Sequence, residues 1–520
     1  MTKGAPFEAL ERRAMFSAGL LPVQRTPVEA GFAPITWAGQ ETYARPGQWV
    51  ARFDGVGGTP QQQLADVNAR LAGEAGLSAD QHLGDDGLVL LHAPREQAFA
   101  QVRDALADVQ GFRRLEPDLM LSIDATPNDP SYGSLWGLNN TGQNGGRVDA
   151  DIDAPEAWEL AKGSASLVTA VIDTGVLYNH PDLAANMWKN PGETPGDGVD
   201  NDGNGFVDDV FGYDFKNNDA DPADDHGHGT HCAGTIAGVG DNGTGVTGVN
   251  WTGKVMALKF LGADGYGDSS DGIRAINYAT KMKTQYGVDV RVTSNSWGGD
   301  AWSQEMEDAI AASGNAGMLF VAAAGNGGED GIGDDNDVTP NYPSNYDLDN
   351  VIAVAATDRN DNRASFSNYG ATTVDLAAPG VSILSTYKDN GYANLSGTSM
   401  ATPHVAGVAT LAFSYNPGAT ASEVKTAILG GVDPIPAMSG KSVSGGRLNA
   451  RRTLARLPLP GDVNGDGAVN LRDFNILAGN FGRTSGVTRS TGDLNGDGRV
   501  DLQDFNLLAG NFGKAREPIV

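Results

Sequence analysis

The stretch "SGTSMATPHVAG", residues 396–407, places a serine at a glycine-flanked turn that leads directly into an apolar helix. The positive end of a helix dipole favours negative charge that develops beside the first helical residues. A serine hydroxyl is a weak nucleophile until a base removes its proton, and that base needs a carboxylate to fix its tautomer. Ser399 is therefore a candidate nucleophile whose base and carboxylate must come from other segments.

Three other segments supply the missing groups. "AVIDTGV", residues 170–176, ends an apolar strand at Asp173, where the catalytic groups of open α/β sheets collect. "GHGTHCAGT" offers His228, and "AAAGNGG" offers Asn326, whose side-chain amide can donate to an oxyanion. A lone DTG is as often a simple turn, and it also occurs in aspartic proteases as one of two copies. The four residues together, in the order Asp, His, Asn and Ser, predict nucleophilic catalysis.

The segment "HGHGTHC", residues 226–232, raises a metal alternative, because it holds three histidines and the chain's one cysteine. Imidazole and thiolate are the usual zinc ligands. Glycines on both sides of His228 suit a tight turn more than a ligand cage. We expect His231 to be a hydrogen-bonded buried histidine and Cys232 to pack as a small apolar residue.

Apolar runs recur along residues 125–456 and alternate with helical stretches. The runs are "LVTAVID" at 167–173, "KVMALKFLG" at 254–262, "VRVTSNSWGG" at 290–299, "GMLFVAAAGN" at 317–326 and "NVIAVAATD" at 350–358. Strands that alternate with helices predict an α/β fold with a parallel sheet covered on both faces.

Composition narrows the class of protein. A chain of 520 residues predicts two to four domains, and a net charge of −29 argues against nucleic-acid binding. One cysteine excludes an internal disulfide, and the absence of an 18-residue apolar run predicts no membrane span. Acidic residues grouped with glycine and asparagine favour Ca²⁺, with a solvated acidic surface as the alternative.

The four candidate residues and their surroundings resemble the subtilisin-like serine peptidases, with thermitase-like and proteinase K-like members among them. The shared motifs are "TPNDP", "IDTGV", "NHPDL", "HGTHCAG", "AAAGN", "AAPG" and "SGTSMATPHVAGVA". The resemblance covers residues 125–456 and implies a secreted serine endopeptidase that acts on proteins or peptides. It assigns Asp173, His228 and Ser399 as the triad and Asn326 as the oxyanion donor.

The same resemblance implies a substrate-binding cleft. Ser296, Trp297 and Gly298 match the strand that pairs with the substrate backbone and walls the primary pocket, and Ala323 to Gly325 form the facing wall. Thr398 would support the oxyanion from a second side. A pocket lined by glycine and alanine, without a charge at its base, should prefer apolar side chains.

The region before the peptidase reads as a small α+β module. Strands are expected at residues 48–55, 87–93 and 112–121, and helices at 60–73 and 94–111. Residues 46–124 resemble the family's inhibitory propeptide, which is removed by self-cleavage. Residues 1–25 resemble the short leader of many exported proteins of planctomycete-type bacteria, so we expect an extracellular or cell-surface protein.

Calcium ligands follow from the resemblance at two places. The first site would use Asp129, Asp182 and Asn242 together with the carbonyls of Val239, Thr244 and Val246. The second would use Asp214, Asn217, Asp219 and Asp221, where Asn217 replaces a carboxylate.

An insertion between residues 184 and 212 offers a further calcium loop, with a solvated acidic loop as the alternative. Asp200, Asp202, Asn204 and Asp208 lie at EF-hand-like offsets, but Phe211 stands where the bidentate glutamate belongs.

The tail carries a stronger calcium signal, because two related segments repeat at a spacing of 31 residues. A linker is expected at 457–461, followed by a helical module at 462–513 that resembles the type I dockerin. Its loops would use Asp462, Asn464, Asp466, Asn470 and Asp473, and then Asp493, Asn495, Asp497, Asp501 and Asp504. Dockerins bind cohesin modules, so a cohesin-like or cell-surface partner is expected. Leu471-Arg472 and Leu502-Gln503 depart from the usual Ser/Thr recognition pair.

Overall fold

The computed structural model describes residues 31–37, 40–74, 76–95, 97–119, 126–328 and 330–515. The leader expected at residues 1–25 lies outside these ranges, as do residues 124 and 125 of the segment 124–128 in which propeptide cleavage is expected. The described residues divide into two compact units, one before and one after residue 124.

The first unit is an antiparallel sheet with two helices. Its elements are β1 Ala33–Trp37, β2 Gln40–Phe53, α2 Pro60–Arg70, β3 Ser78–His82, β4 Leu88–His92, α3 Phe99–Leu106 and β5 Phe112–Leu119. The strand order is β1-β2-β4-β3, and β5 pairs with β2. The predicted strands and helices are present, but β1 and β3 were not predicted. The sequence of β3, SADQH, has no apolar alternation because Ala79 is its one buried residue.

The second unit is built on one large sheet with the order β15-β16-β12-β11-β10-β9-β6-β8-β7. The strands from β12 to β7 in that order are parallel. Its strands are β6 Gly163–Asp173, β7 Gly212–Asp214, β8 Thr252–Lys259, β9 Val290–Asn295, β10 Leu319–Ala323, β11 Val351–Thr357, β12 Leu376–Pro379, β15 Asp433–Pro434 and β16 Gly446–Arg447. A separate hairpin joins β13 Ile383–Tyr387 and β14 Gly391–Leu395. The prediction of an α/β fold with a parallel sheet is confirmed.

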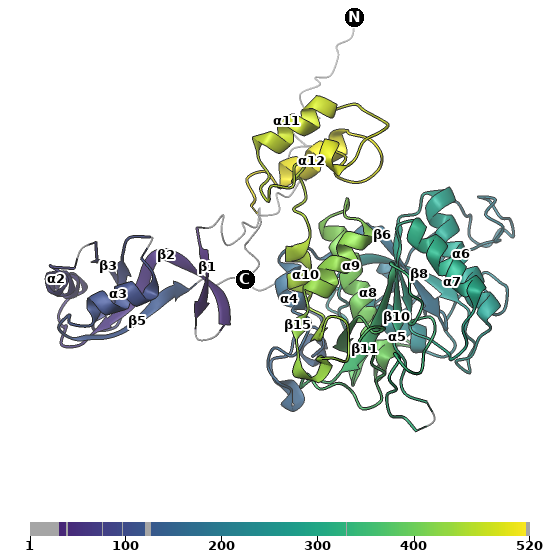
Figure 1. The fold of residues 1–520 in the computed structure, drawn as a ribbon, viewed down its shortest axis with the longest axis horizontal. Helices are drawn as coiled ribbons and strands as arrows, with labels where there is room; N and C mark the ends of the chain where they lie inside the picture. Colours follow the sequence, from purple (N-terminus) through teal and green to yellow (C-terminus); the bar gives the residue numbers. More distant parts are fainter. Residues whose placement is uncertain are drawn as a thin grey trace, which may run out of the picture. The chain divides into compact units, whose positions relative to one another are not determined.

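Helices cover both faces of this sheet (Figure 1). The helices are α4 Ala154–Trp158, α5 His228–Ala237, α6 Ser269–Tyr286, α7 Gln304–Asn315, α8 Thr398–Tyr415, α9 Ala421–Gly430 and α10 Ala450–Arg456. Residues of α6 and α7 share one hydrophobic core with the sheet, and residues of α5, α8, α9 and α10 share another. The second core contains α8, which lies against β6, β9, β10, β11 and β12 and is buried almost throughout.

A buried arginine ties the edge of the sheet to the loops around it. Arg447 of β16 is 3% exposed at its side chain and pairs with Asp361 at 2.5 Å and with Asp433 of β15 at 2.7 Å. Removal of one partner of such a buried pair leaves an uncompensated charge, which costs about 3–5 kcal/mol.

Asp153, which immediately precedes α4, joins the same network through an amide. Asn449 Nδ2 donates to Asp153 Oδ2 at 2.6 Å and to Asp433 Oδ2 at 2.9 Å. Burial, followed by the neighbouring carboxylates Asp151 and Asp433, raises the pKa of Asp153 to about 8. This carboxyl therefore keeps its proton at neutral pH in the folded chain.

The tail forms two helices, α11 Leu471–Asn480 and α12 Leu502–Gly510, around a small apolar core. Equivalent backbone bonds relate its halves: Val469 N donates to Lys514 O at 2.8 Å, and Val500 N donates to Arg483 O at 2.9 Å. The predicted linker at 457–461 is not exposed, because Leu457 and Leu459 are both buried in apolar clusters. None of the helices in the described ranges combines the length and hydropathy needed to span a bilayer.

Candidate active site

The carboxyl ends of three neighbouring parallel strands bring the candidate segments together. Val171 of β6 aligns with Ser294 of β9, and Asn295 aligns with Ala322 of β10. Asp173 is the last residue of β6, while residues 296–298 and 324–326 directly follow β9 and β10. Because buried parallel strands are largely apolar, the polar residues Asp173, Ser296 and Asn326 mark the edge where the strands leave the core.

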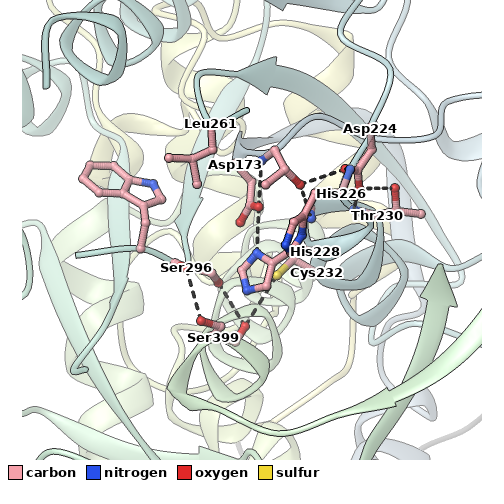
Figure 2. Close-up of polar contacts among 12 residues, drawn as sticks. Asp173, Asp224, His226, His228, Thr230, Cys232, Leu261, Ser296 and Ser399 are labelled. Atoms are coloured by element: carbon pink, nitrogen blue, oxygen red, sulfur yellow. Dashed lines mark hydrogen bonds and ion pairs between the residues drawn. The ribbon is translucent and has the colours of Figure 1, made fainter. Parts of the chain in front are cut away.

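Asp173 and His228 form a direct pair. The Nδ1 atom of His228 lies 2.7 Å from Asp173 Oδ1, and the Asp173 carboxylate is fully buried and also accepts from Thr174 N at 2.7 Å. His228 is the first residue of α5, and its imidazole lies between the carboxylate of Asp173 and the hydroxyl of Ser399 (Figure 2). Nδ1 of His228 thus contacts the Asp173 carboxylate, and the opposite edge of the ring faces Ser399.

The electrostatics around His228 favour its charged form. Burial alone would lower the pKa of His228, but the charge and hydrogen bond of Asp173, and then the charge of Asp224, raise it above its usual value. A histidine held this way binds a proton readily, which general-base chemistry requires.

The two other conspicuous residues of "HGHGTHC" are structural. His231 is fully buried, and its Nε2 lies 2.9 Å from Ile383 O; burial lowers its pKa to about 4. Cys232 is a buried free thiol beneath the base, with Sγ 3.5 Å from Ser399 O. Both predictions are confirmed. Cys232 does have a possible ligand atom within 4.8 Å of those of Asp173 and His228, but His226 and His231 are not in that group.

Ser399 is the second residue of α8, so its backbone N–H is at the positive end of a buried helix. Its Oγ donates to Ser296 O at 3.2 Å, while Ser296 Oγ donates to Ser399 O at 2.9 Å. This reciprocal pair fixes the turn before α8 against the segment that follows β9. The Ser399 hydroxyl is thus oriented toward Ser296 O and not toward His228.

Asn326 and Thr398 are linked at the same turn. The Oδ1 atom of exposed Asn326 accepts from Thr398 N at 2.8 Å and from Thr398 Oγ1 at 3.0 Å. The amide NH₂ is therefore the end of Asn326 that remains free to donate. Thr398 is fully buried, and its hydroxyl donates to Asn326 Oδ1; its support of an oxyanion stays a prediction.

The predicted substrate residues divide between two places. Trp297 and Gly298 line a cavity of about 290 Å³, in which Trp297 packs edge-on against Phe260 with ring centroids 4.9 Å apart. Ser296 is hydrogen-bonded to Ser399. Ala323 is the last residue of β10, and Gly325 lies two residues beyond it. The cavity also has walls that the sequence did not predict: Leu261, Tyr266, Met306, Tyr342 and Tyr346.

A side chain would be crowded at Gly298, in the cavity, and at Gly325, after β10. A Cβ on Gly298 would lie 2.6 Å from Asn341 Oδ1, and one on Gly325 would lie 2.6 Å from Asn368 Nδ2. Gly325 also has a φ of +107°, which L side chains rarely adopt. The resulting cleft is walled by aromatic and aliphatic groups.

The first expected calcium site is a compact acidic cluster. Asp182 is fully buried and accepts from Asn242 Nδ2 and Val246 N, both at 2.7 Å, and Val239 N donates to Asp182 O. Asp129 is buried too, and its Oδ1 has no hydrogen-bond partner. Burial and the charge of Asp129 raise the pKa of Asp182 to about 6. Two buried carboxylates with an unpaired oxygen suit a hard cation. Thr244 joins the cluster through its N–H, which donates to Asn242 Oδ1 at 2.7 Å.

The second expected site is a closed turn. Asp214 accepts from Asn217 N and Nδ2, both at 2.8 Å, and Asp219 accepts from Asp221 N at 3.0 Å. Three groups of at least three acidic, histidine or cysteine ligands converge within 4.8 Å in the described ranges, and neither this turn nor the Asp129–Asp182 pair is among them.

In the insertion, the residues that converge differ from those predicted. Glu193 joins Asp200 and Asp202, while Asp208 instead accepts from the backbone N–H groups of Gly196 and Gly198. Glu193 precedes the EF-hand-like pattern, so the loop spacing alone could not identify it.

The tail loops share one hydrogen-bond pattern. Asp462 Oδ2 accepts from Gly467 N at 2.9 Å, and Asp493 Oδ2 accepts from Gly498 N at 3.0 Å. Asp473 and Asp504 each accept from the two backbone N–H groups that follow the first loop residue. The ligand atoms of Asp462, Asp466 and Asp473 converge within 4.8 Å. The remaining expected ligands, Asn464, Asn470, Asn495, Asp497 and Asp501, lie in the same two loops.

Comparison with known proteins agrees with this arrangement. Residues 164–443 match the subtilase family, and residues 460–512 match the dockerin type I domain. Thermitase from Thermoactinomyces vulgaris is 40% identical over 329 residues, which cover 63% of this chain and 99% of thermitase. Subtilisin DY from Bacillus licheniformis is 40% identical over 261 residues, covering 50% of this chain and 81% of that protein. A solved protease structure from Pseudoalteromonas arctica is 31% identical, with a TM-score of 0.50 and coverage of 64% and 99%. The chain therefore belongs to the subtilase family of serine endopeptidases and carries a type I dockerin domain.

Proposed function

We propose that Ser399 is the nucleophile of a peptide-hydrolysing triad, with His228 as general base and Asp173 as its orienting carboxylate. The observation that carries this assignment is the 2.7 Å contact between His228 Nδ1 and the buried Asp173 carboxylate, with Ser399 on the opposite side of the ring. Rotation of the Ser399 side chain from Ser296 O toward His228 would place its proton within reach of the base. Ser399 Oγ then bonds to the substrate carbonyl carbon, and His228 delivers the proton to the leaving amine as the C–N bond breaks, which leaves an acyl-enzyme. Water, deprotonated by His228, attacks this ester, and the acid product leaves as the proton returns to Ser399 Oγ.

The oxyanion of the tetrahedral intermediate would be bound by two donors. One is the free NH₂ of Asn326, whose carbonyl end is held by Thr398. The other is the backbone N–H of Ser399 at the start of α8, where the helix dipole adds a favourable field. Thr398 holds the Asn326 side chain, and the Ser399 N–H lies in the first turn of buried α8, so little reorganisation is needed when charge develops.

The enzyme is proposed to be made as a self-processed zymogen, exported, and active on the outside of the cell. The first unit, with its own sheet and core, is the candidate for an inhibitory propeptide. The cleft walls, including Trp297 and Leu261, favour substrates with apolar side chains.

Calcium is the proposed cofactor, and it would neutralise clustered carboxylates without entering the reaction. The residues best suited to hold it are Asp129 and Asp182, because both are buried and one Asp129 oxygen is unpaired. Asn242 and the carbonyls of Val239, Thr244 and Val246 complete that set, and the dockerin loops form the other. The turn at Asp214, Asn217, Asp219 and Asp221 is a weaker candidate, since its carboxylates are already engaged by neighbouring N–H groups.

The dockerin domain is proposed to attach the peptidase to a cohesin-like partner. Leu471 and Leu502, the first residues of α11 and α12, are 65% and 61% exposed at equivalent positions. Exposed leucines at these two sites favour a partner surface that is itself apolar.

Digestion of casein with and without chelator tests the proposed activity. Wild-type protein should degrade casein broadly, and EGTA should slow it. A dedicated processing protease would leave casein intact while cutting one partner, and a catalytically silent binding protein on the same scaffold would cut nothing.

A further inference from the structure

A second carboxylate, Asp224, lies behind the proposed base and is 7% exposed. Its Oδ1 accepts from Thr174 Oγ1 at 2.8 Å, from His226 N at 3.0 Å and from Gly227 N at 2.8 Å. Its Oδ2 accepts from Thr230 N at 2.8 Å and from Thr230 Oγ1 at 2.6 Å. Five donors on one carboxylate define its position tightly (Figure 2).

These bonds join β6 and α5, the two elements that carry Asp173 and His228. Thr174 follows Asp173 at the end of β6, and its Oγ1 also accepts from Gly229 N of α5 at 2.9 Å. A Cβ on Gly229 would lie 3.0 Å from the Asp173 Cβ and 2.1 Å from Gly175 O. The first turn of α5 therefore packs directly on the strand end, with no room to shift. Asp224 stabilises this contact, because it accepts hydrogen bonds both from Thr174 after β6 and from Thr230 of α5.

Asp224 also caps α5. The N-cap residue Gly227 has no side chain, so the free N–H groups at the start of this helix need an acceptor from elsewhere. Asp224 accepts from Thr230 N, the third helical residue, and from Gly227 N. It thus performs the capping role from three residues upstream of the N-cap.

The charge of Asp224 matters because His228 is the first residue of α5. The N-terminal end of a helix carries roughly half a positive charge, which disfavours a cationic imidazolium there. The titratable and charged groups around His228 are Asp173 from β6, Asp224 and His226 from the preceding loop, and Cys232 and His231 from α5 itself. Nearby Asp225 is paired with buried Lys259 at 2.7 Å. Asp224 is thus the second carboxylate able to offset the helix field.

We propose that Asp224 is a positioning residue of the peptidase: it fixes His228 against Asp173 through Thr174 and Thr230 and stabilises the imidazolium formed during catalysis. This inference rests on the proposed roles of Asp173, His228 and Ser399. It assigns a function to a residue outside the triad and the oxyanion site.

The test is the pH profile of kcat/KM for full-length enzyme on a short chromogenic peptide amide, comparing wild type with Asp224→Asn, Asp224→Glu and Thr174→Val. Loss of the charge should lower kcat about tenfold or more with KM little changed, because small displacements at a reacting group are costly. It should also move the acid limb to lower pH by about half a unit, since a nearby anion no longer favours the imidazolium. Asp224→Glu keeps the charge, so the acid limb of its kcat/KM profile should lie at the wild-type pH. Thr174→Val should lower kcat without moving that limb.

Asp308→Asn, on the exposed face of α7, removes the same charge away from the site and should change neither quantity. An unmoved acid limb in folded Asp224→Asn would overturn the proposal, as would an unchanged kcat. If Asp224→Asn does not fold, Thr174→Val decides: wild-type kcat there overturns the positioning role. Ser399→Ala, assayed alongside, separates the two hypotheses, because activity in that variant would refute the proposed nucleophile and not the role of Asp224.

Discussion

The buried carboxyl of Asp153 should make the free energy of unfolding of the peptidase unit decrease at alkaline pH, by an amount that can be calculated. Burial and the nearby carboxylates Asp151 and Asp433 raise its pKa to about 8 in the folded chain, whereas an unfolded aspartate titrates near about 3.9. The folded state therefore holds a proton that the unfolded state has lost. The associated stability is fully present below the unfolded pKa and is lost as the pH rises through the folded pKa. Between about pH 6 and pH 9, linkage gives a loss of about 2–3 kcal/mol from this carboxyl.

Asp153→Asn removes the titrating proton while keeping an oxygen for Asn449. The assay is the thermal midpoint of full-length Ser399→Ala protein, which cannot digest itself, at fixed calcium and at pH 6 and pH 9. For a unit of roughly 330 residues, 2–3 kcal/mol corresponds to about 3–4 °C. Between pH 6 and pH 9, the thermal midpoint of the Ser399→Ala parent should therefore fall by about 3–4 °C more than that of the Asp153→Asn chain. The Asp308→Asn control should show the same fall as the parent. Equal losses in parent and Asp153→Asn would refute the protonated state of Asp153.

Three further outcomes are expected. Asn326→Ala should lower kcat about 10²- to 10³-fold with little change in KM on a peptide amide, because it removes one oxyanion donor; an unchanged kcat would exclude that role. N-terminal sequencing of the active form should place cleavage at residues 124–128, which frees Asp129 for its calcium site; a start before Phe112 or after Pro130 would contradict this. The excised tail, residues 461–513, should gain helix by circular dichroism on addition of calcium but not magnesium, since about 50 residues bury too little surface to fold unaided; a spectrum already helical in EGTA would show that the repeats fold without metal.

The parallel sheet was predictable because its central strands are buried on both faces. β6, β10 and β11 each contain an apolar run, and the polar residues at or just after the ends of β6 and β10 identify the site edge. By contrast, β7 has three residues and β3 buries only Ala79, so neither carries a periodic signal.

The candidate site was predictable where glycine-flanked motifs mark a turn, as at His228 and Ser399. The hydrogen bond from the Thr398 hydroxyl to Asn326 was not predictable, because the two residues are 72 positions apart. Glu193 and Asp224 were missed for a similar reason. Their importance comes from backbone N–H groups and carboxylates that only the folded loops bring to them.

Labelling with a fluorophosphonate probe tests the assignment of Ser399 most directly, since this reagent reacts with an activated serine and reports no other property of the fold. After incubation in calcium, wild-type protein should be labelled at Ser399, and Ser399→Ala should not be labelled. Ser396→Ala, in the same turn, serves as the control and should be labelled like wild type. A labelled Ser399→Ala chain, or a wild-type chain modified at another serine, would contradict the proposed triad.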